Sequence, residues 1–162
     1  MRDLAIVDID GVLADTRHRL HHLQRRPKDW KGFFAAAVDD QPHPEGLAVV
    51  ERLAQDHDIV FLTGRPAAEE GNTRAWLERH GLGGHRLVMR PPRDFRPAAQ
   101  VKVELLARLA EGRRVAIVID DDPRVIDAMA AAGHPTLLAD WEPRAPEDDT
   151  TLQRAQEEEG RT

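Results

Sequence analysis

The stretch LAIVDIDGVLAD, residues 4 to 15, is an apolar run that ends in a series of aspartates. Its first part, residues 4 to 9, is rich in β-branched side chains and predicts a buried strand. Because side chains alternate along a strand, Asp8 and Asp10 start on the same side and can converge on one site. Carboxylates this close together repel each other unless something compensates them. They are therefore either turn residues that face water, or ligands of a cation that take part in chemistry.

Four more short apolar runs predict further strands, and amphipathic segments between them predict helices. The predicted strands cover residues 58–63, 86–89, 114–119 and 136–139. The predicted helices cover residues 44–56, 67–80, 98–111 and 123–132, and the last three are followed by Gly81, Gly112 and Gly133. Strands that alternate with helices are typical of an α/β fold, with a mostly parallel five-stranded sheet covered on both faces.

Two segments depart from this alternation. Residues 16–42 hold a histidine-rich helical piece and a second amphipathic piece, which we interpret as a small insertion over one edge of the sheet. Residues 142–162 form an acidic C-terminal tail that starts like a linker, with a frayed polar helix predicted at 149–159. We therefore expect one domain over residues 1–141, followed by this tail.

The composition excludes several classes of protein. No apolar run approaches the roughly 20 residues of a transmembrane helix, and the net charge of −6 has the wrong sign for coating nucleic acid by bulk electrostatics. Residues 17–31 are nevertheless strongly basic and suit an anionic substrate. With no cysteine and no signal-peptide core, the chain is expected to be cytoplasmic. No stable protein partner is evident.

Polar side chains also gather where two later strands end. The second predicted strand runs into Thr63, Gly64 and Arg65, and the fourth runs into Asp120 and Asp121. In an open parallel sheet, ligands bind at the carboxyl ends of the strands. Four carboxylates at that edge need a cation, and hard oxygen ligands select Mg²⁺ rather than Zn²⁺.

These residue types suit phosphoryl chemistry. One carboxylate can attack phosphorus, a second can protonate the leaving oxygen, and cations can hold the phosphoryl oxygens. Asp8, Asp10, Thr63 and Lys102, together with Mg²⁺, can fill those roles. Gly64 allows the backbone to approach a phosphate closely.

The segments DIDGVLAD and FLTGRP, the residue Lys102 and the segment VIDDDP, in this order, resemble the four motifs of the haloacid dehalogenase (HAD) superfamily of phosphohydrolases. The resemblance covers residues 4–141. It implies a three-layer, Rossmann-like α/β fold with strand order 5-4-1-2-3. Because residues 16–42 are too short for a large lid, we also expect a minimal cap or none and an open site.

The resemblance also implies roles for individual residues. Asp8 would be the nucleophile, and Asp10 the general acid and later the base. The metal would be held by Asp8, the backbone carbonyl of Asp10, and Asp121. Thr63 would bind phosphoryl oxygens, and Lys102 would pair with Asp8 and the phosphate, oriented by Asp120.

A narrower resemblance is to the 3′-phosphatase domains of bacteriophage polynucleotide kinase/phosphatases and their stand-alone bacterial relatives. It rests on the segments RHRL (17–20), DWKGFF, NTRAWLERHG, LVMRPPRDFRP and IDDDPRVIDAM. It implies that Arg65 and either Arg17 or Arg19 contact the substrate phosphate. Two departures are visible: no G-x-x-x-x-G-K-[ST] loop for a kinase activity is present, and Ala98 stands where the phage enzyme carries an acidic residue.

The sequence therefore favours a Mg²⁺-dependent phosphomonoesterase that forms an aspartyl phosphate and removes 3′-phosphates from nucleic-acid ends. One alternative is a 5′(3′)-nucleotidase or small-molecule phosphatase, because DIDGVLAD alone also resembles deoxyribonucleotidases. Another is a non-catalytic Mg²⁺- and phosphate-binding regulatory module. A binding module has no need of both Asp8 and Asp10, so this last hypothesis is disfavoured.

Other conspicuous residues have structural interpretations. The histidines His18, His21 and His22 lack cysteine partners and a fourth ligand, so zinc is disfavoured. Asp122 precedes a proline at a helix start and is interpreted as an N-cap. The aromatic residues at helical spacing predict core packing more than base stacking; they are Trp30, Phe33 and Phe34. Three arginines in a proline-rich loop either guide a nucleic-acid backbone or are solvated; they are Arg90, Arg93 and Arg96.

Overall fold

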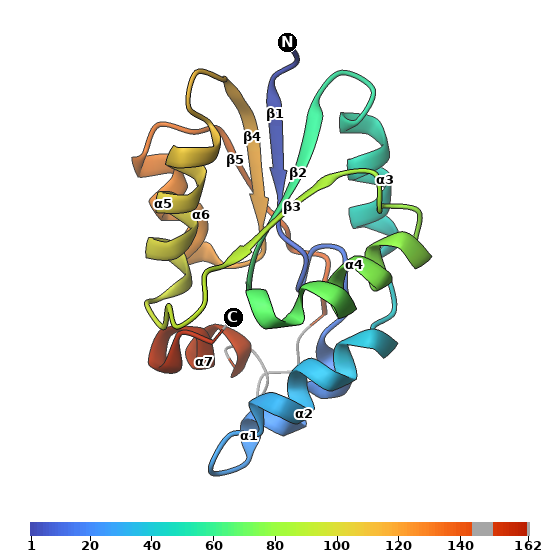
Figure 1. Cartoon of the computed structure of the whole chain (residues 1–162), viewed down its shortest axis with the longest axis vertical. Helices are drawn as coiled ribbons and strands as arrows, with labels where there is room; N and C mark the ends of the chain where they lie inside the picture. Colours follow the sequence, from blue (N-terminus) through green and yellow to red (C-terminus); the bar gives the residue numbers. More distant parts are fainter. Residues whose placement is uncertain (144–150, 162) are drawn as a thin grey trace.

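Five parallel strands form one sheet at the centre of the molecule (Figure 1). The structure is a computed structural model and describes residues 1–143 and 151–161. The strands are β1 (Leu4–Val7), β2 (Asp58–Pro66), β3 (Arg86–Arg90), β4 (Val115–Asp120) and β5 (Thr136–Leu138). Their order is β3-β2-β1-β4-β5, which is the predicted order read from the other edge, and every pairing is parallel.

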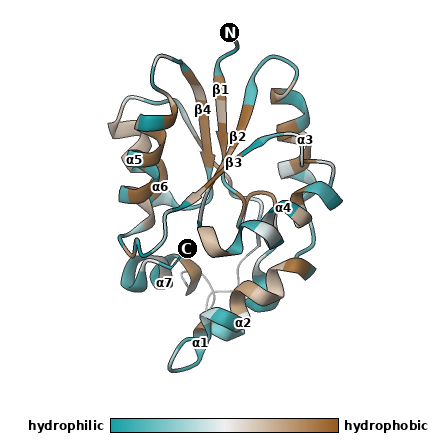
Figure 2. Ribbon diagram, in the orientation of Figure 1, coloured by the Kyte–Doolittle hydropathy of each residue, from teal (hydrophilic) through white to brown (hydrophobic). Residues whose placement is uncertain are grey.

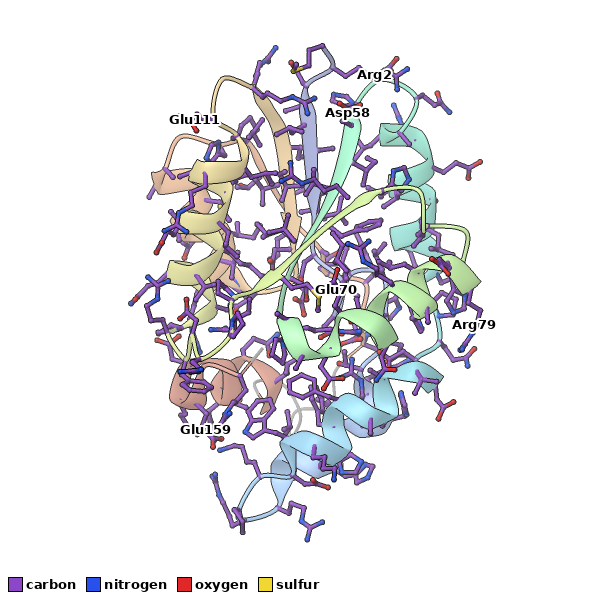
Figure 3. All side chains as sticks on the ribbon, in the orientation of Figure 1. Arg2, Asp58, Glu70, Arg79, Glu111 and Glu159 are labelled. Atoms are coloured by element: carbon purple, nitrogen blue, oxygen red, sulfur yellow. The ribbon has the colours of Figure 1, made fainter. Side chains whose placement is uncertain are left out.

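Helices cover both faces of this sheet, as the alternating pattern predicted. The helices are α3 (Pro44–Leu53), α4 (Glu70–Arg79), α5 (Ala98–Leu109) and α6 (Pro123–Ala131). Alternate residues of β1 enter different layers: Val7 packs in a cluster with Trp76 of α4, whereas Ile6 packs in a cluster with Leu106 of α5. Apolar residues accordingly fill the strands and the inner helix faces in Figure 2. Charged side chains such as Arg2, Arg79 and Glu111 lie outside (Figure 3).

The insertion after β1 forms a small layer of its own beyond the carboxyl ends of the strands (Figure 1). It consists of η1 (Arg17–Arg19), α1 (His21–Gln24), α2 (Trp30–Ala35) and η2 (Ala36–Asp39). Phe33 and Phe34 are buried in a cluster with Leu23, and Trp30 packs against them. The core prediction is confirmed for Phe33 and Phe34, whereas Trp30 is only partly buried.

The polar helix predicted near the C-terminus is present as α7 (Thr151–Glu159), and it is docked rather than frayed. Leu152 and Ala155 are buried in the aromatic cluster of the insertion. Lys28 Nζ lies 2.9 Å from a Glu159 carboxylate oxygen and 3.2 Å from one of Glu158. Within residues 1–143 and 151–161, no helix is long and apolar enough to cross a bilayer. The division of the chain into a domain at residues 1–141 and a tail at residues 142–162 stays a prediction.

Candidate active site

A buried lysine joins the ends of β1 and β4. Lys102 Nζ, from α5, lies 3.0 Å from Asp8 Oδ1 and 2.6 Å from Asp120 Oδ2, and all three side chains are buried. Burial and the neighbouring Asp120 raise the pKa of Asp8 to about 8, although Lys102 opposes this. Burial alone would lower the pKa of Lys102, but Asp120 and Asp8 raise it above its ordinary value. The lysine therefore stays charged between two carboxyl groups.

A third carboxyl group makes this cluster a candidate metal site. Asp8, Asp120 and Asp121 each offer a carboxylate oxygen, and these oxygens lie within 4.8 Å of one another. One lysine cannot balance three buried carboxylates, and a bound cation would supply the missing positive charge. Oxygen donors of this kind suit a hard divalent ion. The contribution of the Asp10 carbonyl stays a prediction.

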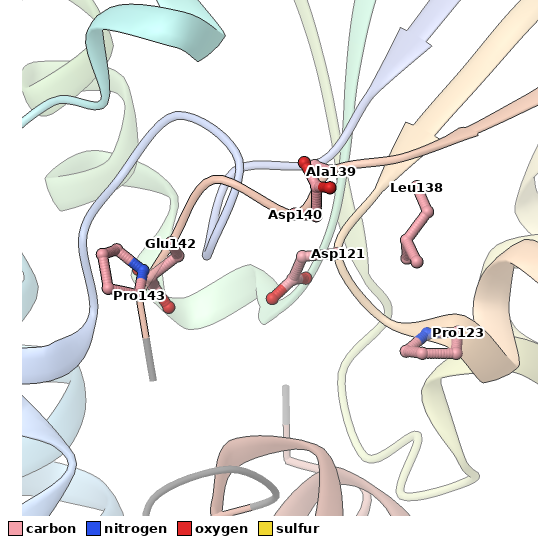
Figure 4. A pocket seen from close by; sticks show the side chains of 7 residues that line it. All are labelled: Asp121, Pro123, Leu138, Ala139, Asp140, Glu142 and Pro143. Carbon is pink, nitrogen blue, oxygen red and sulfur yellow. The ribbon is translucent and has the colours of Figure 1, made fainter. Parts of the chain in front are cut away.

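The cluster is open to solvent beside Asp121. A cavity of about 400 Å³ is lined by Asp121, Pro123, Leu138, Ala139, Asp140, Glu142 and Pro143. Figure 4 shows Asp121 among the residues that line it. Gln153 of α7 donates from Nε2 to Asp121 Oδ2 at 3.4 Å, so α7 reaches the same carboxylate. The C-terminal helix therefore lies at the candidate metal site, which the sequence pattern did not indicate.

Gly11 allows the two strand ends to meet. Its φ of 80° lies in the left-handed region, and a Cβ built on it would be 2.1 Å from Asp121 Oδ2. Any side chain at this position would displace the Asp121 carboxylate. The glycine that follows Asp8 and Asp10 is thus explained by a residue 110 positions later in the chain.

Asp10 is held by two buried arginines. Arg19 Nη2 lies 2.7 Å and Arg65 Nη2 lies 2.6 Å from Asp10 Oδ1. Burial alone would raise the pKa of Asp10, but Arg65 and Arg19 together hold it well below its ordinary range. Arg17, the other candidate, instead pairs with Asp15 at 2.6 Å and is half-exposed. Of the two arginines that the sequence left open, Arg19 lies in the site.

Asp40 completes this cluster, and sequence analysis missed it. Its fully buried side chain accepts two hydrogen bonds from Arg19, from Nε at 2.8 Å and from Nη2 at 2.8 Å, and lies 3.4 Å from Arg65 Nη2. His18 contacts it at 2.7 Å. No local pattern marks this aspartate. The only usable signal is that two buried arginines need more negative charge than Asp10 supplies.

The end of β2 is held by a second set of hydrogen bonds. Thr63 Oγ1 accepts from the backbone N–H of Arg65 at 3.1 Å. The Gly64 carbonyl accepts from Arg90 Nε at 2.9 Å. Arg90 is buried rather than solvated, so it supports the end of β2, which carries Arg65. Arg96 pairs with Asp94 at 2.7 Å, and Arg93 is exposed.

Asp122 caps a helix, and two of the three N-terminal histidines contact aspartates. Asp122 Oδ1 accepts from the backbone N–H of Arg124 at 2.9 Å, which confirms the N-cap. His18 contacts Asp40 and His22 contacts Asp29, at 2.9 Å. In the part of the chain that the structure describes, the groups able to hold a metal include none of the three N-terminal histidines. A second such group does exist, made of Asp15, His43 and Glu142.

In this second group, Glu142 links two distant parts of the chain. Glu142 Oε1 accepts from the Thr16 backbone N–H at 2.8 Å and contacts His43 Nε2 at 3.0 Å. Its Oε2 accepts from the Thr16 hydroxyl at 3.1 Å. The Glu142 carboxylate therefore fastens the chain after β5 to the start of the insertion.

A parallel sheet of this order is also found in solved HAD-like hydrolases. The match to a phosphatase-domain family over most of its length makes the chain a HAD phosphatase, a phosphoric monoester hydrolase. Residues 2–139 match the model of the phosphatase domain of polynucleotide kinase PNKP. The chain belongs to this family. Members of the HAD class are generally metal-dependent, and the buried acidic cluster could bind a metal.

Three relatives illustrate the similarity. A protein of the Autographa californica nuclear polyhedrosis virus, named as a bifunctional polynucleotide kinase/RNA ligase, is 29% identical over 137 residues, which is 82% of this chain and 18% of that protein. A chain of the Pnkp1/Rnl/Hen1 RNA repair complex superposes with a TM-score of 0.71 at 23% identity, over 85% of this chain and 42% of that chain. A HAD-like hydrolase from Streptococcus pneumoniae superposes with a TM-score of 0.66 at 12% identity, over 97% of this chain and 92% of that chain. The present chain thus spans only a fraction of the first two relatives.

Replacing Gly11 tests the contact between the strand ends. Gly11→Ala should cost more free energy of unfolding than Gly112→Ala, and it should also abolish phosphate release. Both glycines have positive φ, but nothing lies within 4 Å of a Cβ at Gly112. In the control, conformational strain should therefore lower the free energy of unfolding by only about 1–2 kcal/mol. In Gly11→Ala, overpacking should lower it by about 1–3 kcal/mol more. Urea unfolding measures the difference, and equal losses in the two variants would contradict the assignment.

Replacing Asp40 tests the arginine cluster. Asp40→Asn should lower the free energy of unfolding by about 3–5 kcal/mol, because it leaves buried arginine charge uncompensated. It should also lower kcat/KM by about 100-fold as Arg19 and Arg65 lose their positions. The matched control is Asp39→Asn, because Asp39 is the exposed neighbour in the same turn. Denaturation and steady-state kinetics check both effects, and identical behaviour of the two variants would refute the role of Asp40.

Proposed function

We propose that the chain is a Mg²⁺-dependent phosphatase that removes 3′-phosphates from nucleic-acid ends through an aspartyl phosphate on Asp8. One observation carries the proposal: two aspartates two residues apart have opposite surroundings. Asp8 lies in an acidic cluster that calls for a cation, whereas Asp10 lies between two buried arginines suited to phosphate oxygens. Asp8, Asp120 and Asp121 would hold the ion, and when bound it supplies positive charge at the phosphoryl oxygens.

In this proposal the chain's own residues form and then hydrolyse an aspartyl phosphate, in two steps. An Asp8 carboxylate oxygen attacks phosphorus, the bond from phosphorus to the ester oxygen breaks, and that oxygen takes a proton from Asp10. A water molecule then gives a proton to Asp10 and attacks phosphorus. The bond to Asp8 breaks, and inorganic phosphate leaves. Lys102 and Arg65 balance negative charge on the phosphoryl group in both steps.

Asp10 must carry a proton for the first step, yet its two arginines favour the ionised form. Phosphate oxygens that accept hydrogen bonds from Arg19 and Arg65 would share the positive charge that now stabilises the Asp10 carboxylate. The pKa of Asp10 would then rise toward the range of a general acid. In this proposal, binding of the substrate phosphate is what allows Asp10 to carry the proton that it donates.

The substrate class rests on the family and on the neighbouring basic residues. The family is that of polynucleotide kinase phosphatase domains, and the viral relative is named for polynucleotide kinase and RNA ligase activities. Arg19 of the basic segment 17–31 contacts Asp10 of the site, and the insertion that carries it is a small layer of short helices. An end of a polymer could enter such a site.

A comparison of substrates tests the function. With Mg²⁺, wild-type protein should release phosphate from a 3′-phosphorylated oligonucleotide faster than from a mononucleotide or a sugar phosphate. Asp8→Asn should release none and should form no acid-stable phosphoenzyme. Release by Asp8→Asn at the wild-type rate would exclude the covalent mechanism. Release only from the mononucleotide would instead favour a nucleotidase, and only from the sugar phosphate a small-molecule phosphatase.

The role of Asp10 can be separated from that of Asp8 by the leaving group. Asp10→Asn should slow the release of phosphate from an alkyl ester such as a 3′-nucleotide by about 10²–10⁴-fold, because the leaving alkoxide needs a proton. It should slow release from p-nitrophenyl phosphate much less, because p-nitrophenolate leaves without one. Steady-state kinetics on the two substrates give the comparison. Equal losses on both would exclude Asp10 as the general acid.

A further inference from the structure

A second cavity lies next to the end of β2, the strand that carries Arg65. It has a volume of about 200 Å³, and Pro66, the residue after Arg65, lines it. Its other walls come from α2, from the loop after β3, and from the end of α7. The cavity therefore adjoins the end of β2, the strand whose Arg65 is proposed to hold the phosphate.

The walls of this cavity are aromatic. Trp30 and Phe34 of α2 line it, and their rings are stacked with centroids 5.8 Å apart and planes at 26°. Both rings are fixed from behind by the core of the insertion. Phe95, on the opposite loop, is 54% exposed, and the Arg161 guanidinium lies 4.4 Å from its ring centroid. Phe95 thus already presents its face to a flat cationic group.

One buried side chain fixes the cavity relative to the end of β2. Arg90, which also lines the cavity, donates from Nε to the Gly64 carbonyl at 2.9 Å. From Nη1 it donates to the carbonyls of Asp94 at 3.0 Å and Arg96 at 2.7 Å, on either side of Phe95. Arg90 therefore sets the distance between Phe95 and the end of β2.

The rim of the cavity is positively charged. Lys31, Arg93 and Arg161 line it and are exposed. The one acidic residue among the lining side chains, Asp94, is paired with Arg96. The surroundings therefore suit a ligand that combines a flat ring with negative charge.

We propose that this cavity binds the base of the 3′-terminal nucleotide while its 3′-phosphate lies at Asp8; the proposal rests on the function proposed above. A volume of about 200 Å³ is below the roughly 300–1,000 Å³ of sites for drug-sized ligands, which suits one ring system. Aromatic side chains stack on any base, so this contact selects nucleic acid without selecting a sequence. Lys31 and Arg93 would meet the next phosphodiester groups.

Removal of one base tests the proposal. Two 3′-phosphorylated oligonucleotides are compared, one intact and one with an abasic terminal nucleotide. Base stacking of about 1–3 kcal/mol predicts a KM about 5- to 150-fold higher for the abasic end. In Phe95→Ala this ratio should fall toward one, because the variant has lost the stacking partner. Phe95→Trp should keep the ratio. Leu137→Ala, which removes another exposed apolar side chain, on β5 at the edge of the sheet opposite β3, should also keep it.

A binding measurement gives a readout other than activity. A 3′-phosphorylated oligonucleotide with 2-aminopurine at its end should lose fluorescence on binding to Asp8→Asn, and should lose less on binding to Asp8→Asn/Phe95→Ala. If wild-type protein releases phosphate from both ends with the same KM, the cavity does not bind the base, and the proposed function stands. If it releases phosphate from no nucleotide or oligonucleotide, the proposed function fails and this inference with it.

Discussion

The contact between Lys102 and the two aspartates Asp8 and Asp120 is the constraint around which the rest of the site is arranged. An unpaired buried carboxylate costs several kcal/mol, so the ends of β1 and β4 can lie side by side only with positive charge between them. Lys102 supplies it from α5, which must therefore pack on this face of the sheet. The same requirement recurs beside it, where Arg19 and Arg65 separate Asp10 from Asp40.

The two charge clusters place Asp8 and Asp10 in opposite electrostatic surroundings. The pKa of Asp8 is raised and that of Asp10 is lowered, which is the reverse of what nucleophilic attack and proton donation require. A cation at the carboxylates would lower the pKa of Asp8, and a phosphate on the arginines would raise that of Asp10. Both reactive protonation states would then arise only when ion and substrate are bound together. Such coupling would limit unproductive chemistry at an open site.

The sequence predicted the fold well because buried parallel strands and their helices have strong local patterns. The strand order came from a resemblance, since periodicity cannot order strands. The pattern at the strand end singled out Asp8 and Asp10, whereas Lys102 was singled out by its place in the order of the family's motifs. Local patterns could not find Asp40, because it is defined only by two arginines from other elements. The same holds for Gly11, whose constraint is Asp121, and for Gln153, whose partner lies 32 residues earlier.

The position of α7 bears on how a chain with a net charge of −6 could act on a polyanion. Glu158 and Glu159 neutralise Lys28, and Glu157 lies 3.2 Å from Arg124, so part of the positive charge near the site is already paired. The exposed cations that line the second cavity, Lys31, Arg93 and Arg161, surround the aromatic walls instead. Attraction to nucleic acid would then be local, directed at an end that fits between rings and arginines. Bulk electrostatics would contribute little, because the acidic helix repels a strand that lies across it.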